Sequence, residues 1–255
     1  MRLIMKNIYK ILADKPMGSL NALELNGVIE YTAKRAGMQA CDLMTLKHAI
    51  DLATLLHRNH IRKNRDACKN TPYIEHPLRN TLRIMRWGCF DINILSASML
   101  HDVVEDSSAL YCNDFLHKDV IPEELAQEQL LKYIRKNFNV ITANTVKSVT
   151  NPIDLNASPT KNADYLEHVK TNIHNNKLVF YVKFSDFVDN AIGLKHGGDD
   201  KFIKRQAKKY QPMIDIYLKE ISNLIVEGHI EQKMTEDMVF KLEYAKIELK
   251  NAVND

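Results

Sequence analysis

The hydrophobic positions along this chain recur mostly at helical spacing. Between about residues 42 and 62 the apolar side chains fall on one stripe, at Leu46, Ala49, Ile50, Ala53 and Leu56. This spacing predicts an amphipathic helix. A second helix is expected from about Ile92 through Asp106, with Asp91 as its cap. The strongly apolar stretch 178–192 is long enough for a buried helix.

Helical spacing continues toward both ends of the chain. Residues 1–41 predict an N-terminal helical addition, and the part after about residue 213 predicts two amphipathic helices broken near Gly228. The segment 107–125 is predicted to be a loop with a short helix. With only 8 Gly and 7 Pro, tight turns are few. We therefore expect an all-α fold whose main domain covers 42–225, followed by a C-terminal helix at 226–255.

Composition narrows the class of protein. A hydrophobic fraction of 45% in 255 residues allows a sizeable core. The net charge of +3 fits an anionic ligand, and no direct DNA binding is expected. Four widely spaced cysteines without a C-x-x-C pair argue against a disulfide framework. Without an apolar run of about 18 residues or a signal-like start, we expect no membrane span and a cytoplasmic location.

The most informative pair is His101 and Asp102. On one helix, Glu105 and Asp106 would follow them at four-residue spacing, which puts an imidazole and three carboxylates on neighbouring faces. Such crowded carboxylates repel unless a cation lies among them, and a mixed nitrogen and oxygen set suits a divalent metal. For the pair alone, a solvated polar helix end is the competing interpretation.

Two further positions offer metal ligands. His76 precedes Pro77, which suits the first turn of a helix and would hold the imidazole at its entrance. Asp186 lies in the apolar stretch on the same helical face as Lys183 and Asn190. A buried carboxylate there needs a metal or a partner, and an ion pair with Lys183 is the alternative. For His76 alone, a structural or exposed histidine is the alternative.

The order of these residues resembles the H…HD…D pattern of HD-domain metal-dependent phosphohydrolases. The segments H-R-N-H-I-R-K (57–63) and T-P-Y-I-E-H-P-L (71–78) are similar to the family stretch H-x-x-Q-x-R-K…P-Y-I-x-H-P-L. L-H-D-V-V-E-D (100–106) matches a family motif, and V-K-F-S-D-F-V-D-N (182–190) is similar to V-K-L-A-D-R-L-H-N. These motifs are typical of the (p)ppGpp hydrolase domain of Rel/Spo proteins and of stand-alone small alarmone hydrolases.

The resemblance implies an all-α HD-domain helical bundle that holds one divalent metal, usually Mn²⁺. The implied metal ligands are His76, His101, Asp102 and Asp186. The implied catalytic residues, which position or deprotonate the attacking water, are Glu105 and Asp106. The implied substrate-binding residues are Arg62, Lys63, Lys183 and Asn190. His57 and His60 are expected to support the site or be exposed, because four ligands already fill the set.

The implied function is removal of the 3′-pyrophosphate from (p)ppGpp, an alarmone of the stringent response. His60, Phe187 and Asp189 replace the family's usual Gln, Arg and His, and the loop 64–70 is longer. These departures keep a second hypothesis open, an HD phosphohydrolase of another phosphorylated nucleotide or of pyrophosphorylated tRNA. A third is an antitoxin-type protein that neutralises a toxin partner by binding. A purine nucleotide is the expected small-molecule partner, and homo-oligomerisation is left open.

Overall fold

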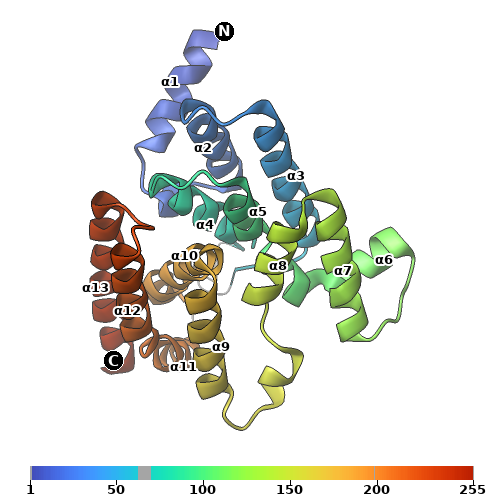
Figure 1. Cartoon of the computed structure of the whole chain (residues 1–255), viewed down its shortest axis with the longest axis vertical. Coiled ribbons are helices and arrows are strands. Elements are labelled where there is room, and N and C mark those ends of the chain that lie inside the picture. The colour runs from blue at the N-terminus through green and yellow to red at the C-terminus, as the bar shows by residue number, and fades with distance from the viewer. Residues whose placement is uncertain (1, 63–69, 198, 255) are drawn as a thin grey trace. The chain divides into compact units, whose positions relative to one another are not determined.

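The computed structural model describes residues 2–62, 70–197 and 199–254, which form helices and connecting segments without a β-sheet (Figure 1). The all-α prediction is thus confirmed. The described residues fall into two compact units, one from 2–60 and 72–153 and the other from 61–62, 70–71, 154–197 and 199–254. The domain boundaries expected at residues 42 and 226 stay predictions. Within the described ranges, none of the helices combines the length and apolarity needed to cross a membrane.

The first unit contains the helices α1 (Arg2–Ala13), α2 (Ala22–Arg35), α3 (Ala40–Leu56), α4 (Glu75–Arg86), α5 (Ile92–Leu100), α6 (Val103–Leu116), α7 (Glu123–Asn137) and α8 (Val140–Val149). Helix α2 packs on α4, and α5 packs on α3, α4 and α8 (Figure 1). The predicted stripe of α3 is buried, from Leu46 to Leu56. The helix ends before the expected residue 62, because the His60 N–H donates to the His57 carbonyl in a turn.

The helix expected from Ile92 through Asp106 is interrupted. Helix α5 ends at Leu100 and α6 begins at Val103, so His101 and Asp102 occupy the turn between them. The interruption places Glu105 and Asp106 in the first turn of α6, where the helix dipole favours carboxylates. The same helix runs on to Leu116, so the loop expected from residue 107 is wrong. Buried Tyr111 and Cys112, together with packing on α7, keep this segment helical.

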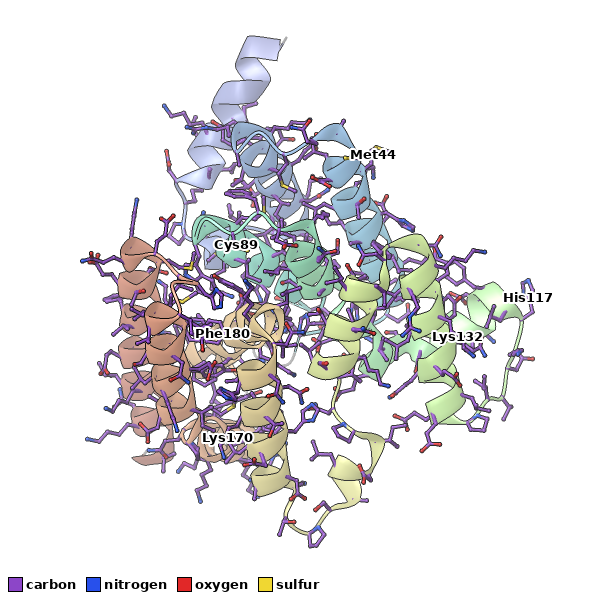
Figure 2. The ribbon with its side chains drawn as sticks, in the orientation of Figure 1. Met44, Cys89, His117, Lys132, Lys170 and Phe180 are labelled. Carbon is purple, nitrogen blue, oxygen red and sulfur yellow. The ribbon has the colours of Figure 1, made fainter. Side chains whose placement is uncertain are left out.

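The second unit contains α9 (Lys161–Asn175), α10 (Lys177–Gly193), α11 (Asp200–Tyr210), α12 (Met213–Val226) and α13 (Gln232–Asn254). As expected, α10 is buried along nearly its whole length, and it packs on α9 and α13. Figure 2 labels Phe180 on this helix, and its ring stacks on Phe184 with the centroids 5.5 Å apart. The Tyr217 hydroxyl from α12 donates to the Lys183 carbonyl at 2.9 Å.

The break expected near Gly228 is also present. Gly228 follows α12 with a φ of +71°, a left-handed conformation that glycine adopts without strain. The apolar face predicted for the last helix is buried in α13, at Met238, Leu242, Ala245 and Leu249. The hydrophobic pattern therefore predicts α10, α12 and α13 correctly, whereas α9 and α11 were not predicted from it.

Candidate functional site

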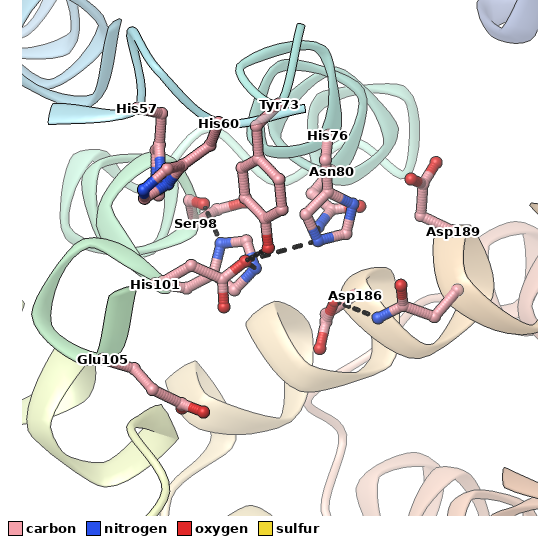
Figure 3. Close-up of polar contacts among 12 residues, drawn as sticks. His57, His60, Tyr73, His76, Asn80, Ser98, His101, Glu105, Asp186 and Asp189 are labelled. Atoms are coloured by element: carbon pink, nitrogen blue, oxygen red, sulfur yellow. Dashed lines mark hydrogen bonds and ion pairs between the residues drawn. The ribbon is translucent and has the colours of Figure 1, made fainter. Parts of the chain in front are cut away.

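In the first unit, His101 and Asp102 are neighbours in the turn between α5 and α6, and Figure 3 labels His101 there. The Nδ1 atom of His101 lies 2.8 Å from the Ser98 carbonyl oxygen, which can only accept a hydrogen bond. This contact places the proton of the ring on Nδ1. The Nε2 atom then faces the Asp102 carboxylate, 2.9 Å from Oδ2. A nitrogen lone pair and a carboxylate oxygen thus approach each other closely.

His76 joins this pair from the first turn of α4, where only 1% of the residue is exposed. Its Nε2 atom lies 3.6 Å from Oδ2 of Asp102, and its ring is 5.1 Å from the His101 ring. The Tyr73 hydroxyl donates to the same Asp102 oxygen at 2.7 Å and so orients the carboxylate. Sequence reasoning did not single out Tyr73, although its place in the P-Y-I-E-H motif was the available signal.

These three residues form a donor set that fits a divalent metal. One ligand atom each from His76, His101 and Asp102 lies within 4.8 Å of the other two. The His101 ring is held by a backbone carbonyl and the Asp102 carboxylate by a tyrosine, which is how proteins orient metal ligands. Two imidazoles and a carboxylate suit a borderline or hard divalent ion. The structure thus brings together three of the four ligands implied by the resemblance.

Glu105 and Asp106 differ in their surroundings although they are adjacent. The carboxylate of Glu105 accepts hydrogen bonds from the Asn151 backbone N–H at 3.2 Å and side-chain amide at 3.1 Å. Burial, followed by the charges of Asp102 and Glu105, raises the pKa of the Asp106 carboxyl to about 7. Asp106 can therefore exchange a proton near neutral pH. In the sequence, Asn151 stands before Pro152, and this pair indicates only a turn.

His57 and His60 lie in the turn after α3, beside Tyr73 (Figure 3). Burial, and to a smaller degree the charge of His60, lowers the pKa of His57 to about 3, against the opposing effect of Asp102. The His57 ring is therefore neutral at physiological pH. The Tyr73 ring packs against it, with the ring centroids 4.7 Å apart.

In the second unit, α10 presents the other expected site residues. The Asn190 amide donates to Asp186 at 2.6 Å, which confirms that these two share a face of the helix. Arg62 donates to the Asn190 oxygen at 2.6 Å and lies 3.4 Å from the Asp189 carboxylate. Asp189, which replaces the family's usual His, is thus an ion-pair partner of Arg62. Lys183 is buried on the same helix, and Lys63 lies outside the described residues.

Phe187 has a packing role in the second unit. It is 2% exposed, and its ring lies 5.0 Å from the Tyr217 ring and 6.1 Å from the Tyr210 ring. The position that carries Arg in the family pattern is therefore filled here by an aromatic core residue.

The chain is similar to known hydrolases, although no family model matches it. The chain is 33% identical over 111 residues to the human guanosine-3′,5′-bis(diphosphate) 3′-pyrophosphohydrolase MESH1, covering 41% of this chain and 58% of that protein. The mouse protein of the same name is 35% identical over 94 residues, covering 36% and 49% of the two chains. The Xenopus tropicalis protein is 30% identical over 98 residues, covering 36% and 54%.

The chain thus spans about half the length of the curated relatives it matches. A solved structure described as "A metazoan ortholog of SpoT hydrolyzes ppGpp and plays a role in starvation responses" superposes with a TM-score of 0.53 at 19% identity. The match covers 79% of this chain and 93% of that one, and it shows a shared fold. The resemblance inferred from the motifs is confirmed by these relatives.

Proposed function

We propose that this chain is a metal-dependent hydrolase that removes the 3′-pyrophosphate from (p)ppGpp. The observation that carries the proposal is the cluster of His76, His101 and Asp102, with Asp106 one helical turn further along α6. The similarity to proteins named as guanosine-3′,5′-bis(diphosphate) 3′-pyrophosphohydrolases supports the same reaction. The products would be GDP or GTP and pyrophosphate.

The metal would be held by His76, His101 and Asp102, with Asp186 as the fourth ligand implied by the resemblance. We propose Mn²⁺ as the ion. When bound, a divalent metal supplies Lewis acidity toward a phosphoryl oxygen and toward water. The protein's own contribution is to fix the ligands, through the Ser98 carbonyl behind His101 and the Tyr73 hydroxyl on Asp102.

The proton taken from the attacking water would pass to Asp106. A general base works best when its pKa lies near the operating pH, and the pKa of Asp106 is about 7. Glu105 would orient the water, because both of its oxygens are engaged by Asn151 and its carboxylate is fixed in place. Each of the two acidic residues thus receives a separate task.

The substrate-binding residues would be Arg62, Asn190 and Lys183, with Lys63 from the segment outside the described residues. Arg62 is already oriented by Asp189 and Asn190, so its guanidinium loses little freedom when it meets a nucleotide. Its planar group can stack on a base or hold a phosphate with two hydrogen bonds. The proposed partner is therefore a purine nucleotide, and the proposed location is the cytoplasm.

The deciding experiment compares nucleotides on one preparation. Metal-free protein is reloaded with Mn²⁺, and kcat/KM is measured for ppGpp, pppGpp and adenosine 3′-phosphates at fixed ionic strength. We expect turnover of ppGpp without a strong preference for pppGpp, because Phe187 leaves α10 without the family's arginine. Turnover of another nucleotide alone would favour the shifted-substrate hypothesis, and no turnover at all would favour the antitoxin hypothesis.

A paired variant tests the metal site. Asp102→Ala should lose both the bound metal and activity, because it removes a ligand of the cluster. Asp51→Ala is the matched control, since Asp51 forms only an exposed ion pair with Lys47 on α3. Elemental analysis of both proteins gives the metal content, and full occupancy in Asp102→Ala would refute the ligand assignment.

A further inference from the structure

A second group of metal-ligating side chains lies in the first unit, outside the cluster of His76, His101 and Asp102. One ligand atom each from His57, His60 and Asp106 lies within 4.8 Å of the other two. The Nδ1 atoms of the two histidines are 3.1 Å apart, and Figure 3 shows the two rings turned toward each other. His60 stands where the family pattern has Gln, so this pair of imidazoles is a feature of the present chain.

Backbone contacts bring the three residues together. The His60 N–H donates to the His57 carbonyl at 2.9 Å, and the Tyr73 N–H donates to the His60 carbonyl at 3.0 Å. The turn after α3 is therefore held at both ends. The Ser107 hydroxyl donates to the Leu56 carbonyl at 3.0 Å, which ties the first turn of α6 to the end of α3. Asp106, next to Ser107, is thereby placed beside the histidine pair.

The ligand atoms of the group also have the spacing that a bound cation requires. His57 is 2% exposed, so its ring is withdrawn from water. Its Nδ1 atom lies within hydrogen-bond distance of the His60 Nδ1 atom, and a cation bound between the two nitrogens would replace that contact. Two nitrogens bound to one tetrahedral zinc ion stand roughly 3.3 Å apart, given bonds of about 2.0–2.1 Å. The 3.1 Å between the two Nδ1 atoms is close to that spacing.

The group is separate from the first cluster. The ring of Tyr73 lies between them in Figure 3, with its centroid 4.7 Å from the His57 ring and 5.7 Å from the His76 ring. The Tyr73 hydroxyl donates to Asp102 at 2.7 Å, in the first cluster. The two groups share none of their ligand residues. The Asp106 residue is exposed to solvent, although the protein around its carboxyl group partly desolvates that group. His60 is partly exposed, so ions from solvent can reach the second group.

We propose that His57, His60 and Asp106 form a second metal site, which binds Zn²⁺. Two neutral imidazoles and one carboxylate are a ligand set that catalytic and regulatory zinc sites use, with one coordination position left open. The consequence for activity rests on the proposed function. A zinc ion here occupies the Asp106 carboxylate, so it removes the group that takes the proton from water and inhibits turnover.

The test first removes a metal ligand from the cluster of His76, His101 and Asp102. In the Asp102→Ala chain, titration calorimetry with Zn²⁺ after chelator treatment should show one equivalent bound. Adding His60→Gln should abolish that binding, because glutamine offers no imidazole. Adding His174→Gln instead should leave it intact, since His174 is an exposed histidine of α9 outside the group. Circular dichroism confirms that each protein is folded. Equal zinc binding in the His60→Gln and His174→Gln proteins would overturn the proposal.

A kinetic comparison then tests the inhibition. With Mn²⁺ in place, added Zn²⁺ should slow ppGpp hydrolysis in the wild-type chain and in His174→Gln. In His60→Gln, the zinc concentration that halves the rate should be at least tenfold higher. Equal zinc sensitivity of the three proteins overturns the regulatory consequence. The calorimetry does not depend on turnover, so an inactive protein would refute the proposed function and leave the zinc site to be decided by binding.

Discussion

Asn151 is the residue whose role depends most on a single geometric fact. It binds Glu105 through both its backbone and its side chain, and it comes from the segment that follows α8. An adjacent Asn-Pro pair suggests only a turn, so a sequence pattern cannot assign it to the site. The contact spans 46 positions of the chain and exists only because of tertiary packing.

Substituting Asn151 should disturb the orientation of the Glu105 carboxylate without affecting metal binding. Asn151→Ala removes the side-chain hydrogen bond to Glu105, which frees the carboxylate to rotate. We expect kcat for ppGpp to fall by about tenfold to a hundredfold, in line with roughly 1.5–3 kcal/mol for one hydrogen bond to a charged group. Metal content should not change. Asn113→Ala, an exposed position of α6, is the control. Equal kcat in the two variants would contradict a positioning role.

The cysteines offer a second prediction at the residue scale. Burial raises the pKa of the Cys89 thiol to about 11, whereas Cys41 is exposed. Thiolates are the reactive form, so iodoacetamide at pH 8 should label Cys41 at least about tenfold faster than Cys89. Mass spectrometry of the two peptides measures the rates. Similar rates would show that Cys89 is not shielded.

The raised pKa of Cys89 makes the stability of the folded protein depend on pH. Folding favours the neutral form of a thiol whose pKa is higher in the folded state than in the unfolded state. Its contribution is complete below the ordinary pKa of 9.0 and is lost as the pH rises toward 11. The free energy of unfolding should therefore fall over this alkaline range, and Cys89→Ala should reduce that fall.

At the scale of elements, α10 shows how one helix serves two purposes. One face carries Asp186 and Asn190, which are hydrogen-bonded to each other. Phe187, Phe184 and Phe180 pack into the aromatic core with Tyr217. The family pattern has Arg at the position of Phe187. The structure instead makes it part of the core, so the family's arginine cannot simply be restored.

Phe187→Arg should accordingly destabilise the second unit. An arginine placed among Tyr210, Tyr217 and the neighbouring aromatic rings loses its hydration, which costs several kcal/mol without a buried partner. Phe187→Leu keeps an apolar side chain and should cost less, on the order of 1–2 kcal/mol. Urea unfolding compares the two midpoints. An arginine variant as stable as the leucine variant would refute the packing role.

At the scale of the whole molecule, the chain divides into two units, each with its own buried core. Hydrogen exchange should report this division, because local openings follow cooperative units. In Phe187→Leu, amides of α10, α12 and α13 should exchange faster, whereas amides of α2, α4 and α5 should change less. Uniform acceleration along the chain would show instead that both units unfold as one.

The sequence by itself determined the helical class, the positions of α3, α10, α12 and α13, and the residue types of the candidate metal site. These features depend on local periodicity and on motifs within a few residues, such as L-H-D-V-V-E-D. The sequence pattern did not predict the helix break at His101, nor that α6 continues to Leu116, because tertiary packing overrides local propensity there.

Only the tertiary structure decided which distant side chains meet. The contact of His76 with Asp102, of Asn151 with Glu105, and of Arg62 with Asp189 and Asn190 each joins segments far apart in the chain. The pairing of His57 and His60 is local, yet Asp106 reaches them only because Ser107 ties α6 to the end of α3. Such meetings follow from how buried helices pack, and no periodicity within a single segment encodes that packing.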